Sequence, residues 1–181
     1  MSSASSRWRV LILELVLFAM LGAMMFTSRV VLAVLPNIHL VGMFTMICAI
    51  VFRVRGLIPV GIYVALEGIF AGFAPWWLAY LYVWAILWGM TVLLPRKMPR
   101  AIAAPVYAVI CALHGLAFGA LCAPAQALVY GYDLGQTLAW ILSGLPFDIV
   151  HGISNFFVGL FLVLPLSELL KKLLRKAGAT E

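Results

Sequence analysis

The sequence predicts an all-α membrane protein, a single domain built as a six-transmembrane-helix bundle with both termini in the cytoplasm. Of its 181 residues, 66% are hydrophobic and only 10% are charged, whereas soluble domains carry about 25% charged residues. A bilayer span needs about 20 mostly apolar residues, so six spans would use most of the chain and leave only short loops. Basic residues recur at every second junction between the apolar segments, which supports this helix count.

Six apolar segments, bounded by proline or basic residues, follow one another along the chain. We expect these helices at about residues 10–35, 38–52, 56–73, 76–94, 101–122 and 138–166. Pro36, Pro75 and Pro124 mark the ends of the first, third and fifth helices, because proline cannot continue a helix as an internal residue. The last helix could begin as late as Pro146, after a polar connection over residues 131–137, and a basic tail follows it.

The orientation of the bundle follows from its basic residues. Eleven of the twelve fall on one side of a six-helix topology, and Arg29 is the exception. Basic loops stay in the cytoplasm, so this side is expected to be the inner one. The net charge of +6 is thereby explained by orientation in a lipid bilayer, and no nucleic-acid partner is expected. The eleven are Arg7, Arg9, Arg53, Arg55, Arg96, Lys97, Arg100, Lys171, Lys172, Arg175 and Lys176.

Polar and aromatic side chains gather at one depth, toward the outer side. Ionisable groups inside a bilayer are costly and by default mark function. Asp148, His151 and Asn155 are spaced i, i+3, i+7 and share one helical face, and the aromatic stripe over residues 77–84 has the same spacing. Two such faces opposite each other would form an amphipathic cavity open to the exterior, of the kind that binds small molecules. The candidate substrate-binding residues are Asn37, His39, Glu67, Trp77, Tyr80, Trp84, His114, Asp148, His151 and Asn155.

Several of these candidates also have a structural interpretation. The aromatic residues could form an interfacial belt, and His114 could be a hydrogen-bonded interior residue. Asp148 and His151 could pair to hold the sixth helix, or could bind a metal, although one Asp and one His are a weak signal and no metal or cofactor is expected. Glu67 is the strongest functional candidate, because a carboxylate in apolar surroundings needs a partner or a proton. The cysteines lack metal-ligand spacing and are interpreted as buried thiols; they are Cys48, Cys111 and Cys122.

Small residues four apart occur in three of the expected helices. This spacing lets helices approach closely, within the monomer or, for the first helix, against another protein. The pairs are Ala19 and Ala23, Gly68 and Gly72, and Gly115 and Gly119. The phosphate loop G-x-x-x-x-G-K-[ST] and the H-E-x-x-H and G-x-S-x-G motifs do not occur, so we do not expect an enzyme. A binding cavity without an energy source suggests a subunit that captures a ligand and depends on partners to move it.

These residues resemble the substrate-binding S component of energy-coupling factor (ECF) transporters, which are prokaryotic vitamin importers. The resemblance covers nearly the whole chain. It is carried by residues 19–23 (AMLGA), 35–39 (LPNIH), 72–77 (GFAPWW), 80–84 (YLYVW) and 144–148 (GLPFD), with His151 and Asn155.

The resemblance implies a complex with a transmembrane coupling subunit and two ATPase subunits in the plasma membrane. Ala19 and Ala23 match the docking motif for the coupling subunit, and the bound S component would topple in the membrane to release its ligand inside. The implied ligand is a vitamin or a vitamin precursor; cobalamin is one candidate, and no diagnostic riboflavin, thiamine or biotin pattern is present.

Two other functions remain open from the residues themselves. The first is an intramembrane enzyme, in which Glu67, His114, Asp148 and His151 form a catalytic or metal site. The second is a passive channel, which fits less well because the inner half of the predicted bundle lacks a polar lining.

Overall fold

The computed structural model describes residues 3–178, and these residues form helices joined by short connections, with no strand among them. The α-helices are α1 (Ser3–Val31), α2 (Val41–Phe52), α3 (Leu57–Ala71), α4 (Pro75–Val92), α5 (Arg100–Leu116), α6 (Phe118–Tyr130), α7 (Leu134–Val158) and α8 (Leu164–Lys176). Two 3₁₀ turns, η1 (Leu32–Val34) and η2 (Arg53–Gly56), and a π-helical segment, η3 (Gly159–Val163), complete the described chain.

Within residues 3–178, four helical stretches are long and apolar enough to cross a bilayer, which is compatible with a multi-pass membrane protein. These stretches are Val10–Val34, Val41–Ala71, Arg100–Tyr130 and Leu134–Lys176. The described residues confirm the predicted all-helical class.

The second stretch turns back on itself at η2. Arg53 there has a φ of 55°, and a Cβ added to Gly56 would stand 2.3 Å from the carbonyl oxygen of Cys48. Residues eight apart in a continuous helix are separated by about 12 Å along its axis. The close approach therefore means that α3 folds back beside α2.

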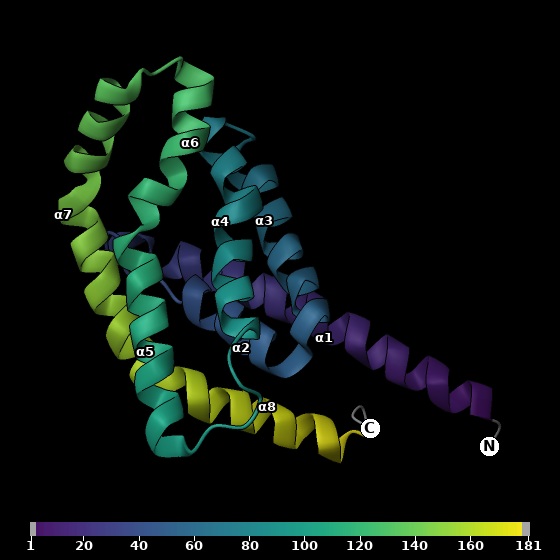
Figure 1. Cartoon of the computed structure of the whole chain (residues 1–181). Coiled ribbons are helices and arrows are strands. Elements are labelled where there is room, and N and C mark those ends of the chain that lie inside the picture. Colours follow the sequence, from purple (N-terminus) through teal and green to yellow (C-terminus); the bar gives the residue numbers. More distant parts are fainter. Residues whose placement is uncertain (1–2, 179–181) are drawn as a thin grey trace.

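Helix α2 forms the centre of the bundle. All of its residues from 41 to 49 are buried, and it contacts α1, α3, α4, α5, α7 and α8. In contrast, α1 is peripheral: within the described chain it packs mainly against α3 and α2, and Arg55 of η2 forms an ion pair with its Glu14. Its N-terminal end extends away from the other helices (Figure 1).

Glycines bring α5 into close contact with α7 and η3. A Cβ added to Gly115 would lie 3.0 Å from the Cα of Gly152, and one added to Gly159 would lie 2.8 Å from the Cα of Ala108. Only residues without a side chain allow backbones to approach this closely. The Gly115 and Gly119 pair predicted from the sequence thus serves packing within the monomer.

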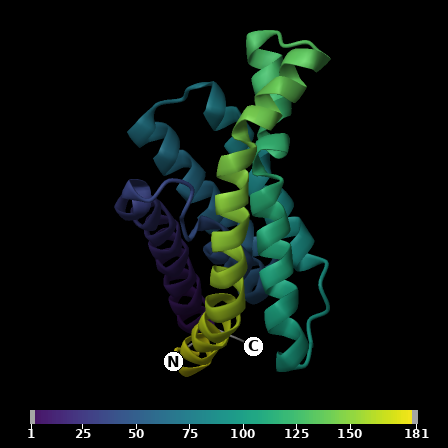
Figure 2. The same cartoon turned by 90° about the vertical axis from the view of Figure 1, so that its left-hand side faces the viewer.

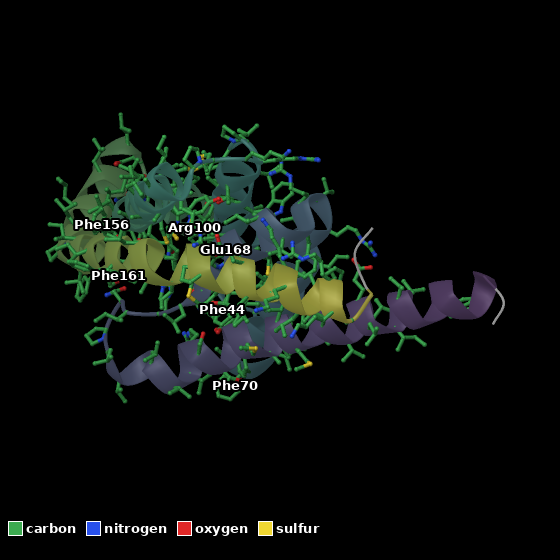
Figure 3. All side chains as sticks on the ribbon, turned by 90° about the horizontal axis from the view of Figure 1, so that it is seen from below. Phe44, Phe70, Arg100, Phe156, Phe161 and Glu168 are labelled. Carbon is green, nitrogen blue, oxygen red and sulfur yellow. The ribbon has the colours of Figure 1, made fainter. Side chains whose placement is uncertain are left out.

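The two ends of the molecule differ. Both termini and the connection between α4 and α5 lie at the lower end in Figures 1 and 2, while α6 and the first half of α7 extend beyond the bundle at the upper end. Helix α8 crosses the base of the bundle (Figure 3), where Glu168 forms an ion pair with Arg100 at the start of α5.

The prediction that Pro124 ends the fifth helix is wrong. The chain continues past Leu116 through Ala117 into α6, contains Pro124, and ends its helix only at Tyr130, where Gly131 has a φ of 69°. Proline is tolerated inside membrane helices where neighbouring groups satisfy the freed backbone carbonyls. A proline at position 124 leaves the carbonyl of Ala120, four residues earlier, without its helical donor. At the next carbonyl, that of Leu121, the hydroxyl of Tyr82 on α4 donates at 2.7 Å.

The last predicted helix also has different bounds. Asp133 and Gln136 form a capping box that starts α7 at Leu134, so Pro146 is an interior residue. The helical path continues through η3 into α8, so the expected basic tail is itself helical as far as Lys176.

The close packing at η3 predicts a specific loss of stability. Gly159→Ala should lower the free energy of unfolding by about 1–3 kcal/mol, because its new methyl group meets the backbone of Ala108. Thermal unfolding in detergent, followed by tryptophan fluorescence, measures this change. The control is Gly61→Ala, whose Cβ would have no atom within 4 Å. Equal unfolding midpoints for the two variants would contradict the tight contact between α5 and η3.

Candidate ligand-binding site

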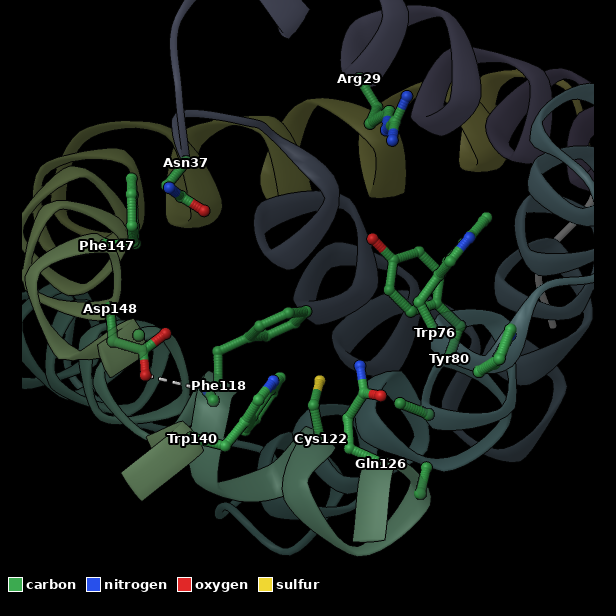
Figure 4. A pocket seen from close by; sticks show the side chains of 15 residues that line it. Arg29, Asn37, Trp76, Tyr80, Phe118, Cys122, Gln126, Trp140, Phe147 and Asp148 are labelled. Atoms are coloured by element: carbon green, nitrogen blue, oxygen red, sulfur yellow. Dashed lines mark hydrogen bonds between the residues drawn. The ribbon is translucent and has the colours of Figure 1, made fainter. Parts of the chain in front are cut away.

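A cavity of about 490 Å³ opens between the end of α1, the connection after it, and helices α4, α6 and α7. Figure 4 shows Asn37 and Asp148 on one side, Trp76 and Tyr80 on the other, and Phe118 between them. The remaining labelled lining residues are Arg29, Cys122, Gln126, Trp140 and Phe147. The wall is mostly apolar, with five aromatic residues among its fifteen and a few polar groups placed around it.

A smaller cavity of about 230 Å³ adjoins the first one. The two share Arg29, Asn37, Tyr80 and Phe118, so they are neighbouring parts of one site. The smaller part extends to residues that include His39 and His151. The two cavities together are lined by residues of α1, of the connection between α1 and α2, and of helices α3, α4, α6 and α7.

Phe118 stands at the junction of the two cavities, directly after the break between α5 and α6. Its ring centroid lies 5.0 Å from that of His151 and 5.6 Å from that of Trp84. Tyr80 lies 6.4 Å from it, in an edge-to-face arrangement. These contacts fix an apolar ring at the point where a ligand entering either cavity would meet it.

Trp84 lies at the centre of a cluster of buried rings that forms the floor of the site. Its ring centroid lies 5.8 Å from His39, 6.0 Å from Tyr63, 5.7 Å from Tyr80 and 5.7 Å from His114. The rings of His39 and of His151 on α7 are themselves 4.5 Å apart. Aromatic and imidazole rings from five segments of the chain thus pack around one buried indole.

Many polar atoms in this floor have no hydrogen-bond partner within the described residues. They are His39 Nδ1, Tyr63 OH, Trp84 Nε1, His114 Nδ1, His151 Nε2 and Asn155 Oδ1. Buried polar atoms in native proteins are nearly always hydrogen-bonded, to protein, water or a ligand. Three of these residues, His39, Tyr63 and His151, line the smaller cavity, where their polar atoms are placed to recognise a polar molecule.

Glu67 is paired with Arg29. Its carboxylate is fully buried on α3, and its Oε1 lies 3.4 Å from Nε of Arg29 on α1. Arg29 also lines both cavities. The lone basic residue on the predicted outer side is therefore the counter-ion of the buried carboxylate, and it brings a positive charge to the cavity wall.

Asp148 is held by the backbone of α6. The Gly119 amide donates to its Oδ2 at 3.0 Å (dashed in Figure 4). A Cβ at position 119 would stand only 2.4 Å from the same oxygen, so this contact requires glycine. Asp148 therefore faces the cavity while joining α7 to α6.

The predicted site residues divide into three groups. The cavity is lined by Asn37, His39, Tyr80, Asp148 and His151. Behind that lining lie Glu67, Trp84, His114 and Asn155. His114 Nε2 is 3.1 Å from the Val83 carbonyl, and Asn155 donates to the Cys111 carbonyl at 3.4 Å, so both also hold helices together.

Trp77 forms a group of its own. Its indole donates to the Val64 carbonyl at 2.8 Å and its ring packs against Phe73, so it contacts α3 and does not line either cavity. Trp76, one residue earlier, lines the larger cavity and packs against Tyr80 at 5.1 Å.

Sequence reasoning did not assign several lining residues to the site. Arg29 had a signal, because it breaks the charge pattern and Glu67 needs a partner. Phe118 had no such signal, since an apolar residue in an apolar helix does not stand out from its neighbours in the sequence. The others include Tyr63, Trp76, Gln126, Trp140 and Phe147.

Comparisons with known protein families, with curated proteins and with solved structures find no match to this chain. Within the described residues, no group of three or more His, Cys, Asp or Glu side chains is placed to hold a metal ion.

The Arg29–Glu67 pair predicts non-additive effects on stability. Arg29→Gln should destabilise the protein by about 1–2 kcal/mol because it leaves a buried carboxylate without its counter-ion. The cost stays below that of a fully buried pair because the Arg29 side chain is 35% exposed. The double variant Arg29→Gln/Glu67→Gln should recover most of the loss in thermal unfolding. Purely additive effects of the two substitutions would contradict this pairing.

Proposed function

We propose that this protein is the substrate-binding S component of an ECF transporter, which captures a vitamin or related micronutrient for ATP-driven import. The observation that carries the proposal is the cavity of about 490 Å³ together with the adjoining one of about 230 Å³, whose lining includes the unpartnered buried polar atoms of His39, Tyr63 and His151. Ligand pockets are concave, mostly apolar, and contain a few placed polar groups, with volumes of about 300–1,000 Å³. A capture subunit needs such a pocket and takes its energy from partner proteins.

The proposal includes six membrane spans with both termini in the cytoplasm. The reversal between α2 and α3 supports counting them as two spans. If α5 with α6 counts as one span and α7 with η3 as another, then these two, together with α1, α2, α3 and α4, make six spans. The basic connections and both termini share one end of the bundle, which the positive-inside rule assigns to the cytoplasm (Figures 1 and 2). The cavity would open on the opposite, outer side.

Helix α1 is the proposed docking surface for the coupling subunit. Ala19 and Ala23 are exposed, whereas Gly22 between them packs against Ile62 on α3. The small-residue face thus points away from the monomer, where it would allow close approach of a partner helix. An apolar groove of about 600 Å³ adjoins Ala23 and runs toward Phe44 on α2.

The ligand proposed for the site is a flat, vitamin-sized molecule. Tyr80, Phe118 and Trp140 supply aromatic surface for stacking. Arg29 supplies a positive charge, and the unpartnered ring nitrogens of His39 and His151 supply hydrogen bonds. The larger cavity alone lies in the lower half of the range for ligand pockets, and the two cavities together lie in its upper half, so the site can hold a vitamin-sized molecule.

Ligand capture is tested by extracting small molecules that co-purify with the protein and identifying them by mass spectrometry. We expect one organic molecule at up to one equivalent, with Phe118→Ala reducing its retention about three- to tenfold through lost stacking. The matched control is Phe161→Ala, an exposed residue of η3 that lines neither cavity. One equivalent of bound metal and no organic ligand would instead favour an intramembrane enzyme.

Docking is tested by co-expression with the coupling and ATPase subunits of the same organism. Ala19→Trp and Ala23→Trp should abolish co-purification and ligand uptake, because bulky side chains hold the partner helix away, while ligand binding by the isolated protein persists. The control is Ala139→Trp, an exposed alanine on α7, on the other side of the bundle. Wild-type uptake by the two α1 variants would contradict the docking assignment without affecting the cavity assignment.

A further inference from the structure

A second, basic pocket lies at the opposite end of the molecule from the aromatic cavity. It has a volume of about 180 Å³ and is enclosed by the end of α2, η2, the end of α4, α5 and α8. Its lining residues are Ile50, Arg53, Thr91, Leu94, Pro95, Arg96, Tyr107 and Lys171. Three of them are cations from three separate segments, and the lining contains no carboxylate.

The backbone conformation of Arg53 positions this residue in the pocket wall. It has a φ of 55° and a ψ of −124°, a conformation that is strained for a residue with a side chain. Two hydrogen bonds hold it there: its guanidinium donates to the Val92 carbonyl at 2.6 Å, and the Trp88 indole donates to the Arg53 carbonyl at 2.9 Å. Strain of this kind persists only where the surroundings fix it, and it concentrates at functional sites.

The cations of this pocket have no acidic partner within the described part of the chain. Neither Arg53 nor Arg96 nor Lys171 forms an ion pair there. Glu168, one turn before Lys171, is engaged by Arg100 through two hydrogen bonds. Three neighbouring positive charges repel one another, so an anion between them would stabilise the arrangement.

Apolar side chains surround this basic pocket. Ile50 and Leu94 form part of its wall, and the exposed side chains of Val54 and Leu93 lie next to it in the chain. Cations flanked by exposed apolar residues are expected at the boundary between lipid headgroups and acyl chains. Basic pockets between membrane helices bind the headgroups of anionic lipids.

We propose that this pocket binds the phosphate group of an anionic phospholipid. Arg53, Arg96 and Lys171 would donate to the phosphate oxygens, while the acyl chains lie along the neighbouring apolar surface. Such a lipid would connect η2, the connection after α4, and α8 at the base of the bundle. The site is separate from the aromatic cavity, so it does not depend on the proposed transport function.

Native mass spectrometry of the purified full-length protein tests this site with phosphatidylglycerol, and with phosphatidylcholine of the same acyl chains. We expect the protein to retain phosphatidylglycerol in preference to phosphatidylcholine. The double variant Arg96→Gln/Lys171→Gln should weaken phosphatidylglycerol binding about fivefold for each charge removed. The control Lys97→Gln/Lys172→Gln removes the same net charge at the adjacent residues, which do not line the pocket, and should retain wild-type binding.

Three results would overturn the proposal. Equal retention of the two lipids, or equal losses in the two double variants, would show that the pocket does not select an anionic headgroup. A third arm separates the two sources of phosphate: millimolar inorganic phosphate is added to delipidated protein in neutral detergent. Thermal stabilisation by phosphate as large as that by phosphatidylglycerol would assign the pocket to free phosphate and reject the lipid.

Discussion

Polar side chains inside an apolar helical bundle must find polar partners, and this requirement organises the molecule. The buried carboxylates, imidazoles and amide do not spread along the helices but converge at one depth, where each can reach a neighbouring helix. Their contacts join α1 to α3, α4 to α5, α5 to α7 and α6 to α7. The pairs are Arg29–Glu67, Val83–His114, Cys111–Asn155 and Gly119–Asp148.

The same convergence creates the candidate binding site. His114 and Asn155 each bond a neighbouring helix with one polar atom and leave another buried atom without a partner among the described residues. Glycines at the α5–α7 contact bring the helices close below the cavity, while the break at Ala117 places Phe118 inside it. At the opposite end the polar groups are cations, and α8 crosses beneath them. One end is thereby suited to an aromatic solute, and the other to the membrane surface.

Some of the site could be predicted from the sequence because depth and helical spacing are encoded locally. Asp148 and His151 share a face by spacing alone, and both line the cavities. The choice between Trp76 and Trp77 could not be made in this way, since it depends on the Val64 carbonyl of another helix. The same limit applies to helix ends: Pro124 predicts a stop, whereas in the tertiary structure the helix continues to Tyr130. Local rules predicted the elements and their polar faces, whereas partners distant in sequence decided which side chains the cavity contains.

Cysteine labelling in intact cells tests most directly the central claim, an aromatic cavity open to the outside of a bundle whose basic end faces the cytoplasm. The background replaces the native Cys48, Cys111 and Cys122 with alanine, and single cysteines are then introduced as Gln126→Cys in the cavity and Lys97→Cys in the connection after α4. The account predicts that a membrane-impermeant maleimide labels the first variant in intact cells and the second only after permeabilisation. Labelling of Lys97→Cys from outside, with Gln126→Cys protected until the membrane is opened, would contradict it.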